Sequence, residues 1–150
     1  MNINCSYKNP NELKSETFEK NHPTDLVVFH NNVRSLNKNL KSIGDIFQNC
    51  DKFPDVLAIT ETKLNGNVYA PNLPGYHPFE DVESKTDAGG VGVYVSNDFE
   101  YIVREDLSLK VSGCEDLWIS ILKNPNDSIS TNSSKNLVIG TIYRHPQKKV

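Results

Sequence analysis

The sequence has few cysteines, no long apolar run and no excess of positive charge. Cys5, Cys50 and Cys114 lie far apart, are odd in number and form no C-x-x-C pair. This pattern argues against a disulfide framework or a zinc site and favours a reducing intracellular compartment, nuclear or cytoplasmic. No stretch approaches the roughly 18 apolar residues of a membrane span, and the N-terminus lacks the apolar segment of a signal peptide. We therefore expect no membrane partner and read no targeting signal.

The charge balance excludes a nucleic-acid-binding protein of the strongly basic kind. The formal net charge is −3, whereas such proteins usually carry a basic stripe or a basic overall balance. Any contact with DNA would have to be local. With 150 residues, of which 37% are hydrophobic, the chain is long enough for one domain core and too short for two. Residues 1–24 are polar and predict a disordered lead-in, which leaves residues 25–150 for the domain.

The first half of the domain predicts a strand, a helix and a second strand. Leu26–Phe29 is a β-branched and aromatic run that predicts a strand, and Asn32 is expected just past its end. Apolar residues then recur at spacings of three and four and predict a helix over residues 37–49. The four apolar residues Val56–Ile59 predict a strand buried on both faces, and Glu61 follows its end.

This order makes a βαβ unit with parallel strands and a right-handed crossover. Because parallel neighbours place their carboxyl ends on the same edge, Asn32 and Glu61 should lie at one rim, where ligands bind in open α/β sheets. The position alone leaves a second interpretation open for each residue. Glu61 could be the first solvated residue after a core strand, and Asn32 could be a turn residue.

The second half predicts further strands. Gly89–Val95 is a strand whose glycines either make a sharp entry turn or let another backbone approach closely. It is not a phosphate-binding loop, because no Walker motif follows and it opens a strand rather than a helix. A turn after it predicts an antiparallel hairpin over residues 90–103. The alternation over Leu117–Leu122 and the apolar run Leu137–Tyr143 predict two more strands, the last one buried, so that an α/β sandwich is expected.

Four segments of the sequence, taken together, resemble a known family. They are Asn32-Val33-Arg34-Ser35-Leu36, Asp55–Thr62, Gly89–Tyr94, and Ile139–Arg144 with Pro146. In this order they resemble the N-terminal half of the endonuclease/exonuclease/phosphatase (DNase I-like) family, most closely the apurinic-endonuclease-like nuclease domain of LINE-type non-LTR retrotransposons. The resemblance covers residues 25–146 and implies a four-layer α/β sandwich of two sheets faced by helices, with the active site at one rim of the sheets.

The resemblance also implies a chemistry, the hydrolytic nicking of DNA phosphodiester bonds with Mg²⁺ as cofactor. It implies that Glu61 holds the ion, that Asn32 helps to place the ion and the scissile phosphate, and that Tyr143 contacts the phosphate in the transition state. A buried aromatic role for Tyr143 stays open. No matching motif calls for a histidine at His145, which is interpreted as a loop residue.

The sequence also departs from the family. Arg34 and Arg144-His145-Pro146 differ from the family's usual residues, which leaves metal chemistry in place and makes the substrate harder to assign. The Gly-Asp-Phe-Asn-like and Ser-Asp-His motifs of the family's C-terminal half do not occur. We therefore expect a C-terminally truncated domain with little activity alone, which in a longer polyprotein could accompany a reverse transcriptase. Two alternatives remain: a phosphodiesterase acting on lipid, inositol phosphate or RNA, and a non-catalytic remnant or interaction module.

Overall fold

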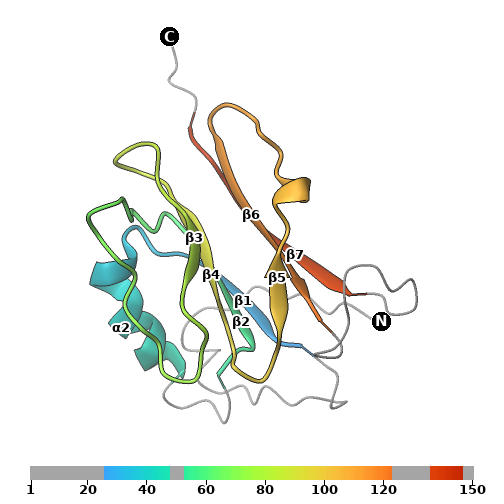
Figure 1. Cartoon of the computed structure of the whole chain (residues 1–150). Helices are drawn as coiled ribbons and strands as arrows, with labels where there is room; N and C mark the ends of the chain where they lie inside the picture. Colours follow the sequence, from blue (N-terminus) through green and yellow to red (C-terminus); the bar gives the residue numbers. More distant parts are fainter. Residues whose placement is uncertain (1–25, 48–52, 123–135, 147–150) are drawn as a thin grey trace.

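The computed structural model describes residues 26–47, 53–122 and 136–146. The predicted disordered lead-in over residues 1–24 lies outside these ranges. In the described residues the chain is an α/β structure, mostly strands, with one α-helix and two sheets (Figure 1). Its elements are β1 (Val28–Asn32), α2 (Leu36–Phe47), β2 (Val56–Thr60), β3 (Glu80–Val82), β4 (Val91–Val95), β5 (Tyr101–Val103), the short 3₁₀ helix η1 (Glu105–Leu107), β6 (Cys114–Ile121) and β7 (Leu137–Arg144).

The first sheet has the strand order β1-β2-β4-β3. β1 runs parallel to β2, as the strand-helix-strand pattern predicts, and β4 runs antiparallel to both β2 and β3. Every residue of β2 is buried, because α2 covers one face of the sheet and the second sheet covers the other. The predicted burial of this strand on both faces is therefore confirmed.

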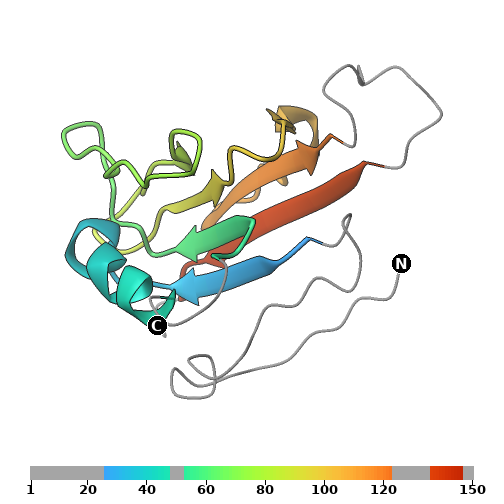
Figure 2. The same ribbon diagram turned by 90° about the horizontal axis from the view of Figure 1, so that it is seen from below.

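Two apolar cores follow from the alternation of side chains along β2. Leu57 and Ile59 face α2 and pack with Leu36 and Phe47. Val56 and Ala58 face the second sheet. The described layers are thus helix, sheet and sheet, which are seen from left to right in Figure 1 and from below in Figure 2. Among the described residues, no helix is both long and apolar enough to cross a membrane.

The second sheet, β5-β6-β7, is antiparallel throughout, and it corrects the predicted hairpin over residues 90–103. Both edges of β4 are already paired, one with β2 and one with β3, so β5 cannot pair with β4. The turn closed by Phe99 N–H donating to Ser96 O instead carries the chain from one sheet to the other. A turn signal between two strands predicted the change of direction but not the pairing partner.

Two strands are also less buried than their sequences predict. β7 alternates between covered and exposed residues, with Val138 41% and Ile142 44% exposed, because only its inner face packs against the first sheet. β1 alternates in the same way and continues to Asn32, which is its last residue rather than a residue beyond its end. β1 pairs only with β2 in the described residues, and one open face allows polar residues inside the strand.

Gly92, in the middle of β4, should not tolerate a side chain. A Cβ there would lie 2.4 Å from the Phe79 ring and 2.6 Å from the backbone oxygen of Glu80, so we expect Gly92→Ala to lower the free energy of unfolding by about 1–3 kcal/mol. Gly44 in α2 is the matched control, because a Cβ there meets nothing within 4 Å and Gly44→Ala should gain about 0.5–1 kcal/mol. Urea denaturation followed by circular dichroism measures both, and equal effects would contradict the packing argument.

Candidate active site

The carboxyl ends of β1 and β2 place Asn32 and Glu61 side by side. Asn32 is paired with Thr60 in the parallel register, so Glu61, the next residue along, lies at the same rim. The Asn32 amide Nδ2 donates a hydrogen bond to Glu61 Oε1 at 2.7 Å, across 29 positions of sequence. The predicted meeting of these two residues at one rim is confirmed.

Glu61 lies on a backbone segment that is held in an unfavourable conformation. Glu61 and Lys63 both have φ near +55°, a region that costs a non-glycine residue of the order of 1 kcal/mol or more. The segment is held by hydrogen bonds from Thr62 N–H to Gly90 O and from Lys63 N–H to Gly89 O. Because the entry to β4 fixes this turn, the Glu61 carboxylate has a defined direction at the rim.

The paired glycines before β4 explain how the two segments approach so closely. Gly90 has φ +84°, and a Cβ there would lie 2.2 Å from Thr62 Oγ1. Gly89 has φ +152°, and its Cβ would lie 2.6 Å from Glu115 Oε2. The sequence left open whether the glycines serve a sharp turn or a close approach, and the structure shows both at the same two positions.

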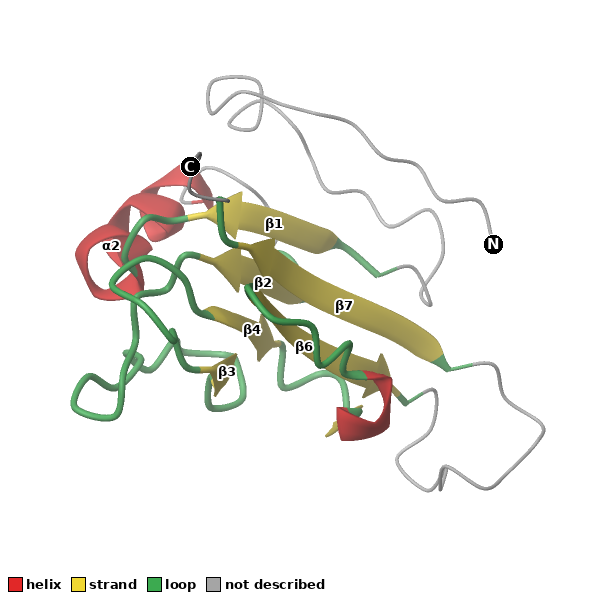
Figure 3. Cartoon of the chain, turned by 90° about the horizontal axis from the view of Figure 1, so that it is seen from above, coloured by secondary structure: helices red, strands yellow, loops and turns green. Residues whose placement is uncertain are grey.

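Tyr143 reaches the same place from the second sheet. It is the penultimate residue of β7, and Figure 3 shows that β1, β2 and β7 end on the same side of the molecule. The Tyr143 hydroxyl lies near the Glu61 carboxylate. Partial burial, the nearby charge of Glu61 and the charge of Glu115 raise the pKa of Tyr143. The hydroxyl therefore keeps its proton at neutral pH and acts as a neutral donor.

A buried carboxylate that the sequence reasoning missed lies behind Tyr143. The Glu115 side chain has no exposed surface, and it accepts hydrogen bonds from Lys85 N–H at 2.9 Å and from Gly90 N–H. His145 Nε2 lies 3.0 Å from Glu115 Oε1, and this nitrogen must be the donor because a carboxylate only accepts. His145 does follow the last strand, as predicted, but it is tied into the site rather than free in a loop.

A signal for Glu115 was present in the sequence. Glu115 lies on the same face of β6 as Leu117, Ile119 and Ile121, because alternate residues of a strand point the same way. These three residues face the core. A carboxylate on the apolar face of a strand is costly unless it has hydrogen-bond partners. The alternation pattern could therefore have marked this residue as one with a specific buried partner.

Exposed basic residues lie close in sequence to each of the site residues, although the whole chain is acidic. The exposed residues Arg34, Lys63 and Arg144 each lie within two positions of Asn32, Glu61 or Tyr143. Exposed Lys85 is tied to the same region through its backbone bond to Glu115. These exposed basic residues are candidates for contacts with a phosphate, in keeping with the expectation that any contact with a polyanion is local.

The oxygen donors at the rim meet the modest demands of Mg²⁺. Within the described ranges, no group of three or more His, Cys, Asp or Glu residues could hold a metal ion. Mg²⁺ is commonly held by one or two carboxylates, with waters and substrate phosphates completing its shell, and the Glu61 carboxylate can supply one. As its amide is oriented, Asn32 donates to Glu61 and its Oδ1 accepts from Arg34 N–H at 3.3 Å, so it would act on an ion mainly by orienting Glu61.

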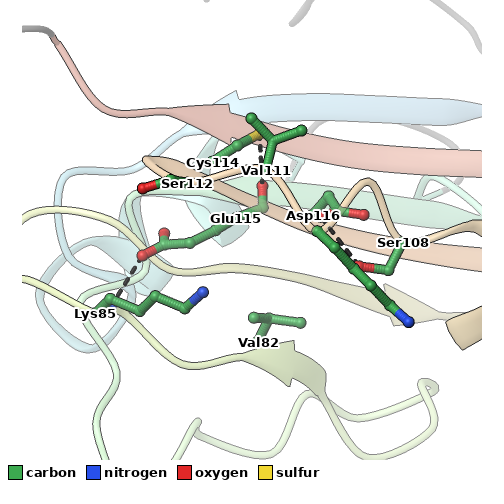
Figure 4. A pocket seen from close by; sticks show the side chains of 9 residues that line it. Val82, Lys85, Ser108, Val111, Ser112, Cys114, Glu115 and Asp116 are labelled. Carbon is green, nitrogen blue, oxygen red and sulfur yellow. Dashed lines mark hydrogen bonds between the residues drawn. The ribbon is translucent and has the colours of Figure 1, made fainter.

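A pocket of about 460 Å³ lies at the start of β6, and none of Asn32, Glu61 or Tyr143 lines it. Its wall includes Lys85 and Glu115, whose hydrogen bond is drawn in Figure 4. The pocket therefore adjoins the buried side of the site, and the rim itself stays the candidate for chemistry. No protein-family model matches the sequence, and no curated protein matches it either.

Proposed function

We propose that the chain carries the Asn32, Glu61 and Tyr143 part of a Mg²⁺-dependent endonuclease active site, which nicks DNA by hydrolysing phosphodiester bonds. The observation that carries the proposal is that side chains from two different sheets meet at Glu61: Asn32 donates a hydrogen bond to its carboxylate, and Tyr143 lies close enough for the charge of that carboxylate to raise the pKa of its hydroxyl. The ordered resemblance to the endonuclease/exonuclease/phosphatase family, and within it to the nuclease domains of non-LTR retrotransposons, supports the same assignment.

Glu61 would hold the ion in this proposal. Its carboxylate is half-buried at the rim and is directed by the Asn32 amide at 2.7 Å. A bound Mg²⁺ ion would neutralise charge on the phosphate oxygens and would lower the pKa of a bound water. An amide beside the carboxylate suits this site, because it orients Glu61 without adding a negative charge that would repel a phosphate.

Tyr143 would donate a hydrogen bond to a phosphoryl oxygen. A tyrosine hydroxyl ordinarily has a pKa of about 10, so Tyr143 is protonated and able to donate at neutral pH. A donor placed where charge develops on the phosphoryl group stabilises the transition state more than the ground state. Because a phenol has one proton to donate, the phosphoryl oxygen would be the sole acceptor of the Tyr143 hydroxyl in this state, with Glu61 turned to the ion.

Local cations favour a polyanionic substrate over a small one. Arg34, Lys63 and Arg144 are exposed on three different segments that end at or follow the rim, and such cations could contact phosphates, which give most of the affinity in non-specific DNA binding. A lipid phosphodiester, an inositol phosphate or RNA would satisfy the same phosphate contacts. Comparing the nicking of supercoiled plasmid with the hydrolysis of these substrates separates the alternatives.

The proposal also includes the four-layer sandwich and a reverse transcriptase domain as partner. The exposed apolar residues Val138 and Ile142 on the outer face of β7 support a fourth layer of helices covering the second sheet. We propose that such a layer, the missing catalytic motifs and a reverse transcriptase domain belong to a longer polyprotein. The 150-residue chain alone should then nick DNA slowly, because positioned proton transfer contributes roughly 10²- to 10⁴-fold to such reactions.

Tyr143→Phe should separate catalysis from metal binding. Loss of one donor to a developing oxyanion costs about 10²- to 10³-fold in rate, so the slow Mg²⁺-dependent nicking of supercoiled plasmid should fall to background. The affinity for Mn²⁺, measured by electron paramagnetic resonance, should not change, because Glu61 is intact. Tyr69→Phe is the control, since Tyr69 is 86% exposed. If the unaltered chain neither binds the ion nor nicks plasmid, the proposed function is wrong.

A further inference from the structure

We propose that Glu115 and His145 form a positioning pair that fixes the Tyr143 hydroxyl for its contact with phosphate. This inference rests on the proposed function and adds to it two residues that the resemblance does not assign. His145 is the residue that contacts Tyr143, and Glu115 acts through His145. Neither is proposed to touch the ion or the substrate.

The pair starts from a rigid anchor. The Glu115 carboxylate has no exposed surface and accepts from two backbone N–H groups, those of Lys85 and Gly90. Gly90 lies on the segment that also fixes the turn of Glu61, through its backbone oxygen and Thr62 N–H. The carboxylate is therefore fixed relative to Glu61 by backbone contacts, which move less than side chains do.

His145 passes this constraint on to Tyr143. Its Nε2 lies 3.0 Å from Glu115 Oε1, and its ring meets the Tyr143 ring edge to face, with the ring centroids 5.1 Å apart at 84°. Its backbone N–H donates to Gly113 O at 2.9 Å, so the residue is held at both ends. Edge-to-face contacts between rings are favourable beyond the area that they bury, so this contact biases the orientation of the Tyr143 ring.

The register of the second sheet completes the arrangement. Glu115 is the direct cross-strand partner of Tyr143, so the carboxylate flanks the tyrosine on β6 while His145 flanks it from the end of β7. Gly89 also lies close to His145, since a Cβ at position 89 would lie 2.7 Å from His145 Cε1. A leucine at position 115 would continue the apolar face of β6 without the cost of burying a charge, so the carboxylate calls for a role beyond packing. Its contacts support two such roles: it accepts from the backbone N–H groups of Lys85 and Gly90, and it directs His145.

Two substitutions of His145 divide the pair into its components. His145→Phe keeps a ring against Tyr143 but loses the hydrogen bond to Glu115, whereas His145→Gln keeps a donor and loses the ring. The His145 side chain is 18% exposed, and a thermal melt checks that both variants fold. Glu115→Gln is the third variant and is informative only if its melt is cooperative.

The readout is Tb³⁺ luminescence excited through tyrosine, with Tb³⁺ as the probe of the Glu61 site. Sensitised emission falls steeply with the distance between ring and ion, and Tyr143→Phe defines the emission that other aromatic residues contribute. We expect both His145 variants to bind Tb³⁺ with unchanged affinity and to lose most of the Tyr143-dependent emission at saturation. The turnover of plasmid nicking should fall by about 10- to 100-fold, as misplacement by about 1 Å can cause, with KM for plasmid unchanged.

The result separates this inference from the proposed function. If Glu61→Gln leaves Tb³⁺ affinity unchanged, the metal site and hence the proposed function are wrong. If Glu61→Gln abolishes binding while both His145 variants keep the full Tyr143-dependent emission, the proposed function stands and the positioning pair is overturned. Loss of emission accompanied by an equal loss of Tb³⁺ affinity would also overturn it, because that result indicates general damage to the site.

Discussion

Glu61→Gln is expected to remove Mg²⁺-dependent nicking from the chain and to leave its fold intact. The substitution replaces the carboxylate that accepts a hydrogen bond from Asn32 and lies near Tyr143 with a neutral amide of the same shape. Residues that only support a metal ligand typically change metal affinity or activity by 10- to 100-fold. The loss of the ligand itself should therefore weaken Mg²⁺ affinity by at least about 100-fold.

The fold should survive this change for a local reason. Glu61 is half-buried, and the glutamine oxygen can still accept the hydrogen bond from Asn32. Isothermal titration with Mg²⁺, together with a thermal melt, measures both expectations. Glu83→Gln is the matched control, since it removes an exposed carboxylate outside this set of contacts. An unaltered Mg²⁺ affinity in Glu61→Gln would contradict the assignment of Glu61 as the ligand.

The first half of the fold was predictable because its signals are local. Val56–Ile59 is apolar throughout, and a strand with two covered faces has no polar side to show. A helix with one apolar stripe between two strands implies a parallel pair. From that pairing the meeting of Asn32 and Glu61 follows without any knowledge of side-chain contacts. The helix itself begins at Leu36, one residue earlier than predicted.

The second half was less predictable because pairing there depends on which strand edges are free. The segment over residues 90–103 has the composition of a hairpin, but β3, a strand of three residues that the sequence did not reveal, occupies the edge of β4 that β5 would need. The run Leu137–Tyr143 looks like a buried strand because its outer residues are also apolar. Composition indicates that a residue can be buried, and only the neighbouring layers decide whether it is.

The site residues likewise fall into those that local sequence signals predict and those that depend on strand pairing. Asn32, Glu61 and Tyr143 each end or follow a strand, a place where sequence reasoning looks for ligands. Glu115 lies inside a strand and His145 lies beyond one, and their relation depends on the pairing of β6 with β7 and on the approach of Gly90. Those contacts involve segments that are 25 and 30 residues apart in sequence, with no pattern linking them.

Glu115→Ala should destabilise the chain more than any other single substitution at the site. It removes the common acceptor of Lys85 N–H, Gly90 N–H and His145 Nε2, in a place where the Glu115 side chain has no exposed surface. Each buried donor left without an acceptor costs about 1–3 kcal/mol. Because a small domain is stable by only about 5–15 kcal/mol, a loss of about 3–5 kcal/mol is expected to bring it close to unfolding.

Urea denaturation followed by circular dichroism measures this loss, and two further variants show its origin. Glu115→Gln keeps one acceptor oxygen and should lose less stability than Glu115→Ala, since some of the three donors remain satisfied. Glu105→Ala, which removes an exposed carboxylate from η1, should leave the unfolding midpoint unchanged. If Glu115→Ala unfolds at the same urea concentration as the unaltered chain, water must replace the carboxylate without cost, and Glu115 would then no longer be a rigid anchor for the turn of Glu61 and for His145.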